Sequence, residues 1–143
     1  MAHFAQIGYE NKVLHVSVVR NEDILDENGN ESEEIGIQFL KSVHGHLTNW
    51  LQTSYNGNFR YRYAGIWMVY NVEYDVFLLP QPYPSWTLNT ETFNWNPPIP
   101  EPELTEEQKE AGSYYEWNEE TQNWELKTIT WHHLHQHRQQ PSR

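Results

Sequence analysis

Apolar and polar residues alternate along much of the chain with the two-residue period of β-strands. Phe4, Gln6 and Ile7 precede a turn-like segment at residues 8–12, and the valine-rich segment 13–20 after it shows partial alternation. Alternation with this period places one face of a strand against a core and the other face in water. Residues 3–20 are therefore predicted to form a β-hairpin with its turn at residues 8–12.

The pattern changes to a helical period after an acidic stretch at residues 21–34. Four apolar residues recur at helical spacing, namely Ile35, Phe39, Leu40 and Val43. The acidic side chains favour a helix N-terminus, Asn30 or Ser32 suits the cap, and His44-Gly45 suits the end. A helix near residues 32–44 is predicted.

The dipeptide Asn56-Gly57 separates two further strand-like segments, residues 50–55 and 59–63. Both central positions of a type I′ turn need positive φ, which Asn and Gly adopt readily. A two-residue hairpin turn is predicted at this dipeptide. Residues 66–70 and 76–79 are predicted to form the next pair of strands.

Two groups of prolines interrupt the strands, first Pro80, Pro82 and Pro84, then Pro97, Pro98, Pro100 and Pro102. Proline cannot donate a backbone hydrogen bond within a central sheet. The second group and the glutamates after it predict an extended arm at residues 96–113, with one or two helical turns at 105–111. Strand-like patterning returns at residues 114–131, and a polar, histidine-rich tail follows at 132–143.

These elements predict a mainly β (α+β) protein, in which antiparallel β-hairpins form a small sheet or sandwich with one short helix. The expected parts are a β-rich domain at residues 1–95, the arm at 96–113, an aromatic hairpin at 114–131 and the tail at 132–143. We expect the arm to place the hairpin on a neighbouring subunit, the alternative being its own domain.

Three segments share one eight-residue pattern, with a large apolar residue and Asn at the start, Glu in fourth place and an aromatic residue at the end. They are residues 70–77, 88–95 and 117–124. An Asn side chain can begin a tight turn by bonding nearby backbone, and two large side chains can then meet across the strands. Each segment is predicted to be a hairpin, and Trp117 is predicted to face Trp124.

The composition is aromatic, with seven Trp, nine Tyr and five Phe residues among 143, while the hydrophobic share is only 37%. Such residues serve both cores and interfaces. The core interpretation is favoured for most of them, and sugar-stacking platforms are the alternative. The residues selected as interface candidates are Tyr83, Trp86, Trp95, Pro97, Pro98, Trp117, Trp124 and Trp131.

The formal net charge of −11 argues against a nucleic-acid partner and against an anionic membrane surface, because both repel an acidic protein. No apolar run is long enough to span a bilayer, and the N-terminus lacks the pattern of a signal peptide. The chain has no cysteine, which excludes a disulfide framework. Synthesis in the cytosol is expected.

Two segments resemble metal sites but lack a full ligand set. Asp26, Asn28, Asn30 and Ser32 are spaced as in a calcium loop, but the twelfth position is Ile37, so a solvated loop is the favoured interpretation. The tail contains His132, His133, His135 and His137. A solvated or partner-contacting tail is favoured over a metal site there. No catalytic constellation is recognised, so we expect no enzyme and no cofactor.

Several longer strings along the chain are distinctive, namely MAHFA (1–5), DENGNESE (26–33), QTSYNGNFR (52–60), YAGI (63–66), PQPYPSWTLN (80–89) and YEWNE (115–119). These strings resemble short proteins encoded by tailed phages of marine bacteria, notably cyanophages. The resemblance covers most of residues 1–126, and members of that family tend to stop near Leu126. Members are mostly uncharacterised, and some are virion components. The resemblance implies no catalytic residues.

The resemblance and the residues together predict a virion structural protein, synthesised in the host cytoplasm. A capsid decoration or cement subunit is the expected role, because an acidic surface keeps such a protein soluble before assembly and aromatic patches can bind the particle. Its expected partners are other virion proteins, the major capsid or tail protein, with self-association as a further expectation. The alternatives are a tail or fibre adaptor, a carbohydrate-binding adhesion module, and an intracellular phage protein that binds a host factor.

Overall fold

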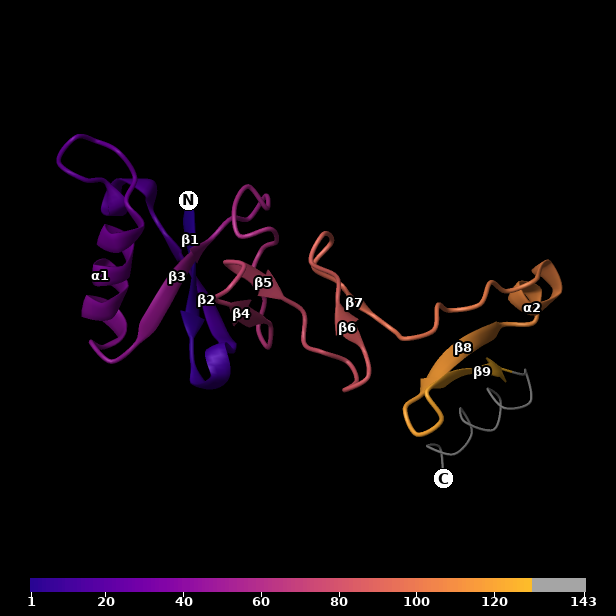
Figure 1. Cartoon of the computed structure of the whole chain (residues 1–143). Helices are drawn as coiled ribbons and strands as arrows, with labels where there is room; N and C mark the ends of the chain where they lie inside the picture. Colours follow the sequence, from indigo (N-terminus) through magenta and orange to yellow (C-terminus); the bar gives the residue numbers. More distant parts are fainter. Residues whose placement is uncertain (130–143) are drawn as a thin grey trace, which may run out of the picture. The chain divides into compact units, whose positions relative to one another are not determined.

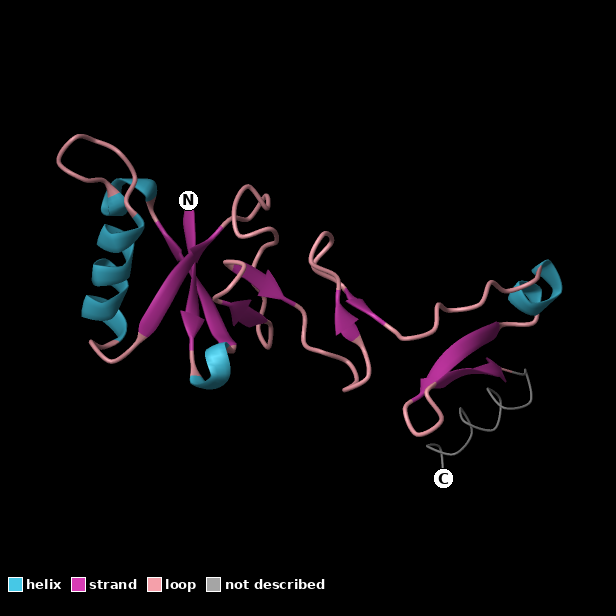
Figure 2. Cartoon of the chain, in the orientation of Figure 1, coloured by secondary structure: helices cyan, strands magenta, loops and turns pink. Residues whose placement is uncertain are grey.

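The computed structural model describes residues 1–129 (Figures 1 and 2). The chain divides into two compact units, Met1–Pro80 and a second unit that begins at Gln81. Both consist mainly of antiparallel β-structure, which confirms the predicted fold class. The boundary lies earlier than the predicted one after residue 95, because residues 81–96 pack with the aromatic hairpin that follows them.

The first unit is built on a three-stranded antiparallel sheet with the strand order β2-β1-β3. The strands are β1 (Ala2–Ile7), β2 (Val13–Val19) and β3 (Asn49–Thr53). Strands β1 and β2 form the hairpin predicted at residues 3–20, with the short 3-10 helix η1 (Tyr9–Asn11) in its turn. A register shift between Gln6 and Ile7 marks a β-bulge.

Helix α1 (Glu33–His44) covers one face of this sheet (Figure 1). The Ser32 hydroxyl accepts a hydrogen bond from the backbone N–H of Ile35, and Gly45 ends the helix with φ of 120°. The helix and its caps match the prediction. Its buried residues are Gly36 and Leu40, whereas Val43 is 60% exposed, so the predicted apolar stripe is not wholly core. The core here contains Ala2, Phe4, Val19, Ile24, Leu40 and Trp50.

The opposite face of the sheet is covered by residues 64–78. This segment contains the hairpin of β4 (Val69–Asn71) and β5 (Val76–Leu78), close to the predicted pair at residues 66–70 and 76–79. A second core cluster lies between hairpin and sheet, made of Ala5, Val13, Ala64, Met68 and Phe77. The first unit is therefore a sheet packed on both faces, which explains why its central strand β1 has buried residues of both parities.

The hairpin predicted around Asn56-Gly57 is wrong, although the dipeptide does form a turn. Gly57 has φ of 70°, and its N–H bonds to the carbonyl of Ser54. Residues 59–63 form no strand, and β3 pairs with β1. The chain after the turn bends instead, with positive φ at Arg60 and Tyr61, so that the Arg60 side chain reaches the edge of β3.

The second unit contains two hairpins separated by the proline-rich segment. Its elements are β6 (Thr87–Leu88), β7 (Trp95–Asn96), α2 (Glu106–Glu110), β8 (Ser113–Asn118) and β9 (Asn123–Thr128). The Thr105 hydroxyl and the Gln108 amide form a capping box, which explains the short helix inside the predicted arm. Strands β8 and β9 confirm the predicted aromatic hairpin as far as the described residues reach.

The three eight-residue segments fold alike, as predicted. Their first and last residues are cross-strand partners, Tyr70 with Phe77, Leu88 with Trp95 and Trp117 with Trp124. In each turn the Asn side-chain oxygen accepts a backbone N–H, at Asn71, Asn89 and Asn118. The sixth residue is left-handed in all three, with φ of 53° at Asp75, 54° at Phe93 and 51° at Gln122. The pattern therefore specifies one four-residue turn.

Candidate functional site

Four aromatic rings gather in the second unit. Trp86 lies 5.9 Å from Trp117 and 6.1 Å from Trp124 between ring centroids, and Trp117 and Trp124 are 5.2 Å apart at 70°. Tyr83 adds a fourth ring, 5.7 Å from Trp86. Edge-to-face contacts at these distances are favourable for aromatic pairs. Trp117 is only 6% exposed, so this cluster forms the core of the second unit.

The indole N–H groups of the cluster differ in their partners. Trp117 donates to Glu119 at 2.8 Å, and Trp124 donates to the carbonyl oxygen of Ile99 at 2.8 Å. The buried N–H of Trp86 has no hydrogen-bond partner among the described residues. The Ile99 contact attaches the proline-rich arm to the hairpin that follows it.

The carboxylate of Glu119 joins the two halves of the cluster. It accepts the Ser85 hydroxyl at 2.7 Å, the Ser85 backbone N–H at 3.1 Å and the Trp117 indole N–H. These hydrogen bonds, first that of Trp117 and then those of Ser85, hold the pKa of Glu119 below its ordinary value. Glu119 therefore stays ionised and fixes the turn before Trp86 against the hairpin loop.

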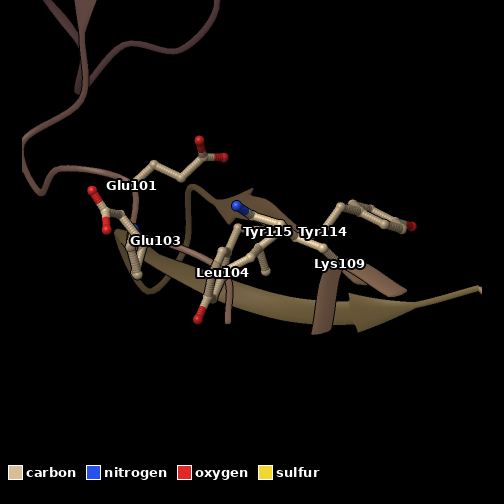
Figure 3. A pocket seen from close by; sticks show the side chains of 7 residues that line it. Glu101, Glu103, Leu104, Lys109, Tyr114 and Tyr115 are labelled. Atoms are coloured by element: carbon tan, nitrogen blue, oxygen red, sulfur yellow. The ribbon is translucent and has the colours of Figure 1, made fainter. Parts of the chain in front are cut away.

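A pocket of about 500 Å³ lies between the arm, α2 and β8 (Figure 3). It is lined by Glu101, Pro102, Glu103, Leu104, Lys109, Tyr114 and Tyr115. Lys109 pairs with the exposed Glu106 at 3.5 Å. Tyrosine rings beside carboxylates offer a stacking surface and hydrogen-bond acceptors, so the pocket suits a polar ligand with hydroxyl or amino groups.

In the first unit, Arg60 is the centre of a charged network. Its side chain, 14% exposed, donates to Glu33, to Asp75 at 2.8 Å and to the carbonyl oxygen of Gln52 at 2.8 Å. Burial opposes the guanidinium charge, but the hydrogen bonds to Glu33 and Asp75 outweigh it and raise the pKa of Arg60. The hydrogen bonds from Arg60 and Tyr70 lower the pKa of Asp75. This network joins α1, β3 and the β4–β5 hairpin.

The structure brings together four of the predicted interface residues, Tyr83, Trp86, Trp117 and Trp124. Because these rings pack on one another, much of their surface serves the core of the unit. Trp95 instead lies opposite Leu88 in the β6–β7 hairpin, and Pro98 is exposed while Pro97 is half-buried. Trp131 lies outside the described residues.

Sequence reasoning missed an exposed apolar group on the first unit. Trp67 is 67% exposed with φ of 74°, and its neighbour Ile66 is also exposed. Hydrogen bonds from Trp67 N–H to the Val13 carbonyl and from Val13 N–H to the Met68 carbonyl hold the backbone there. Positive φ is unusual for a bulky residue and often marks a functional position. The sequence carried no signal for it, because Trp67 stands among apolar residues expected in a strand.

In the candidate calcium loop, the first carboxylate accepts hydrogen bonds from the loop's own backbone. Asp26 accepts the backbone N–H groups of Asn28 and Asn30, both at 2.9 Å, and so forms a local turn. Within residues 1–129 no group of three or more His, Asp or Glu side chains is placed to hold a metal ion. The histidine cluster at 132–137 lies outside that range.

No family model, curated protein or solved structure matches the chain. Among residues 1–129, none of the helices is both long and apolar enough to span a bilayer.

Proposed function

We propose that the chain is a structural protein of a phage particle, bound to the assembled capsid as a decoration or cement subunit. The observation that carries the proposal is the exposure of Trp67 on a hydrogen-bonded, left-handed backbone, beside the exposed Ile66. Tryptophan is the residue most enriched at binding hot spots. Because a hydrogen bond to Val13 already holds the backbone of residue 67, that backbone loses little further freedom when a partner covers the side chain.

Charge and architecture support the same role. The net charge of −11 keeps free copies apart until a partner is met. The second unit offers a different surface, with the pocket between its arm and hairpin. Two compact units on one chain allow two separate contacts on a particle, whose combined affinity exceeds that of either one. The resemblance of residues 1–126 to virion-associated phage proteins fits this arrangement.

Copy number in purified particles tests the proposal. Quantitative mass spectrometry should find on the order of hundreds of copies per particle for a capsid subunit, because decoration follows the capsid symmetry. About six or twelve copies would instead support the tail or fibre adaptor. Absence from particles would refute a virion role and leave an intracellular function.

A binding test locates the contact. The Trp67→Ala variant should lose most of its occupancy on stripped particles, while Val43→Ala, a change at a residue of α1 that is 60% exposed, should keep it. A chain ending at Pro80 tests whether binding to the particle requires the second unit. This shortened chain is expected to fold, because the first unit has its own two core clusters. Full occupancy by the Trp67→Ala variant would show that this side chain is not the anchor.

A carbohydrate-binding role is the second candidate, favoured by the pocket of Figure 3. Sugars bind through aromatic faces together with polar side chains, and Tyr114, Tyr115, Glu101 and Glu103 supply both. Binding of the full chain to a glycan array, lost in Tyr115→Ala and kept in Trp67→Ala, would favour this role. An array with no bound glycan would remove it.

A further inference from the structure

A small pocket lies at the end of the first-unit sheet, where β1 begins and β3 ends. Its volume is about 200 Å³, and we call it the loop pocket because the loop after β3 supplies much of its lining. The lining residues that matter for its chemistry are Asn21, Glu31, Tyr55, Asn56, Asn58 and Phe59. The pocket therefore combines polar side chains with aromatic ones.

The polar groups of the loop pocket are mainly uncharged side-chain amides. Those of Asn21, Asn56 and Asn58 have no hydrogen-bond partner among residues 1–129. The side-chain oxygen of Asn71, by contrast, holds its own turn. An amide both donates and accepts hydrogen bonds, as a hydroxyl group does. The three free amides therefore match a ligand that carries several hydroxyl groups.

Two exposed aromatic side chains accompany these amides. Tyr55 is 68% exposed and Phe59 is 42% exposed, and both line the loop pocket. The Tyr55 ring stacks on His3, with centroids 5.6 Å apart and planes at 28°, and its centroid lies 5.3 Å from that of Tyr63. These contacts restrict the ring while much of its surface still faces solvent. Aromatic side chains beside a few polar groups are typical of small-molecule sites.

Internal hydrogen bonds hold the backbone of the loop. The Ser54 hydroxyl accepts the N–H of Asn58 at 2.9 Å, and the Ser54 carbonyl accepts the N–H of Gly57 at 3.0 Å. The buried hydroxyl of Thr53 accepts the N–H of Ala64 at 2.8 Å. A site whose backbone is already ordered loses less entropy when a ligand binds. The walls of the loop pocket are therefore in place before the ligand arrives.

Charge and size narrow the class of ligand. Among its described lining residues the loop pocket has one carboxylate, Glu31, and no Lys or Arg side chain. Phosphate and carboxylate ligands are usually bound by such cationic side chains, so an anion is disfavoured. The volume of about 200 Å³ is smaller than the roughly 300–1,000 Å³ of sites for drug-sized ligands, so the pocket accommodates a single ring.

We propose that the loop pocket binds one ring of a neutral sugar. The apolar face of the sugar stacks on Tyr55, and its hydroxyl groups bond to the side-chain amides of Asn21, Asn56 and Asn58. A sugar ring has this combination of an apolar C–H face and a hydroxylated edge. The site differs from the pocket of Figure 3, which belongs to the second unit. The inference stands independently of a role in a phage particle.

Saturation-transfer NMR on the full chain tests for sugar binding. The probes are free glucose, galactose, mannose, rhamnose and N-acetylglucosamine, each at about 20 mM. At least one of them should receive saturation from the protein, with a dissociation constant on the order of 1 mM, because a single ring makes few contacts. The proposal is overturned when none of the five sugars receives saturation.

Matched variants locate the bound sugar. Tyr55→Ala should raise the dissociation constant about tenfold and Asn58→Ala about fivefold, because each removes one side-chain contact. Asn58→Ala keeps the backbone N–H that bonds to the loop, so it remains informative even where loss of the Tyr55 ring disturbs folding. Tyr9→Ala and Asn28→Ala are the controls, since both residues are exposed and neither lines the pocket. Binding that both Tyr55→Ala and Asn58→Ala retain at wild-type strength, or that only Tyr115→Ala loses, would overturn the assignment to the loop pocket.

Discussion

Replacement of Arg60 by alanine should destabilise the first unit without affecting the second. The substitution removes the donor to Glu33, Asp75 and the Gln52 carbonyl, and it removes the guanidinium that lies 5.8 Å from the Tyr70 ring centre. Glu33 still accepts the N–H of Gln52, but its charge is no longer balanced. Helix α1, the β3 edge and the β4–β5 hairpin lose the side chain that joins them.

The magnitude follows from the burial of the three charges. Breaking a fully buried ion pair costs about 3–5 kcal/mol, and an exposed pair contributes at most about 1 kcal/mol. The Arg60 side chain is 14% exposed, whereas those of Glu33 and Asp75 are 33% and 61% exposed. We therefore expect a loss of about 2–3 kcal/mol for the first unit, between the two limits. The positive φ of residue 60 does not affect the difference in stability between wild type and variant, because this backbone conformation costs alanine about as much as it costs arginine.

Urea unfolding followed by amide hydrogen exchange and mass spectrometry separates the two units. Peptides from β1 and β3 should lose protection at lower urea in the variant, while peptides from β8 and β9 serve as the internal control. The Arg60→Lys variant keeps the charge but cannot bond three acceptors in a plane, so it should fall between the two. Equal stability of wild type and Arg60→Ala would show that the network contributes nothing.

Acid pH should reduce the difference in unfolding free energy by which the wild type exceeds the Arg60→Ala variant. The hydrogen bonds from Arg60 and Tyr70 lower the pKa of Asp75, so its contribution is complete above the unfolded value of about 3.9 and is lost as pH falls through the folded value. The difference in unfolding free energy between the two proteins should therefore shrink below about pH 4. A difference that grows on acidification would contradict this account.

Three further substitutions test local features. Gln122→Gly should raise the stability of the second unit by about 0.5–1 kcal/mol, because residue 122 has φ of 51°, and Glu120→Gly in the same loop should give no gain in a thermal melt. Gly36→Ala should destabilise the first unit by about 1–3 kcal/mol in urea, because the added Cβ would lie 2.2 Å from the Phe4 ring; a stabilised variant would contradict the packing. Glu119→Gln should lower the melting temperature and weaken the near-ultraviolet circular dichroism of the tryptophans, and an unchanged spectrum would show that the carboxylate does not order them.

Features set by neighbouring residues could be predicted from the sequence. The helix at residues 33–44 carries its own signals, with Ser32 as the cap and Gly45 at the end, and the structure uses both. The repeated turns were likewise predictable, since the Asn that begins each one bonds backbone within three residues. Such contacts lie within a few residues of one another, so a short pattern contains all the partners.

Features set by distant residues could not be predicted. The dipeptide Asn56-Gly57 has the residues of a hairpin turn, but a hairpin also needs a second strand paired with β3. In this structure β3 pairs with β1 instead of with residues 59–63. The Arg60 network joins residues 27 and 15 positions away from it, and no local pattern marks such partners. The unit boundary at Pro80 was hidden for the same reason, because it depends on Trp86 packing against Trp117 far along the chain.

In the three repeated turns, local contacts determine the backbone and distant contacts determine how the side chains pack. Their backbone is the same although the left-handed position holds Asp, Phe or Gln, so the Asn and the strand pairing determine the turn. The two large side chains that face each other at the base of each turn pack in different places. Tyr70 and Phe77 pack in the second core cluster of the first unit, whereas Trp117 and Trp124 pack against Trp86. A repeated hairpin thus supplies an aromatic pair, and the rest of the chain decides what that pair contacts, which is why the repeat predicts architecture but cannot by itself predict a binding partner.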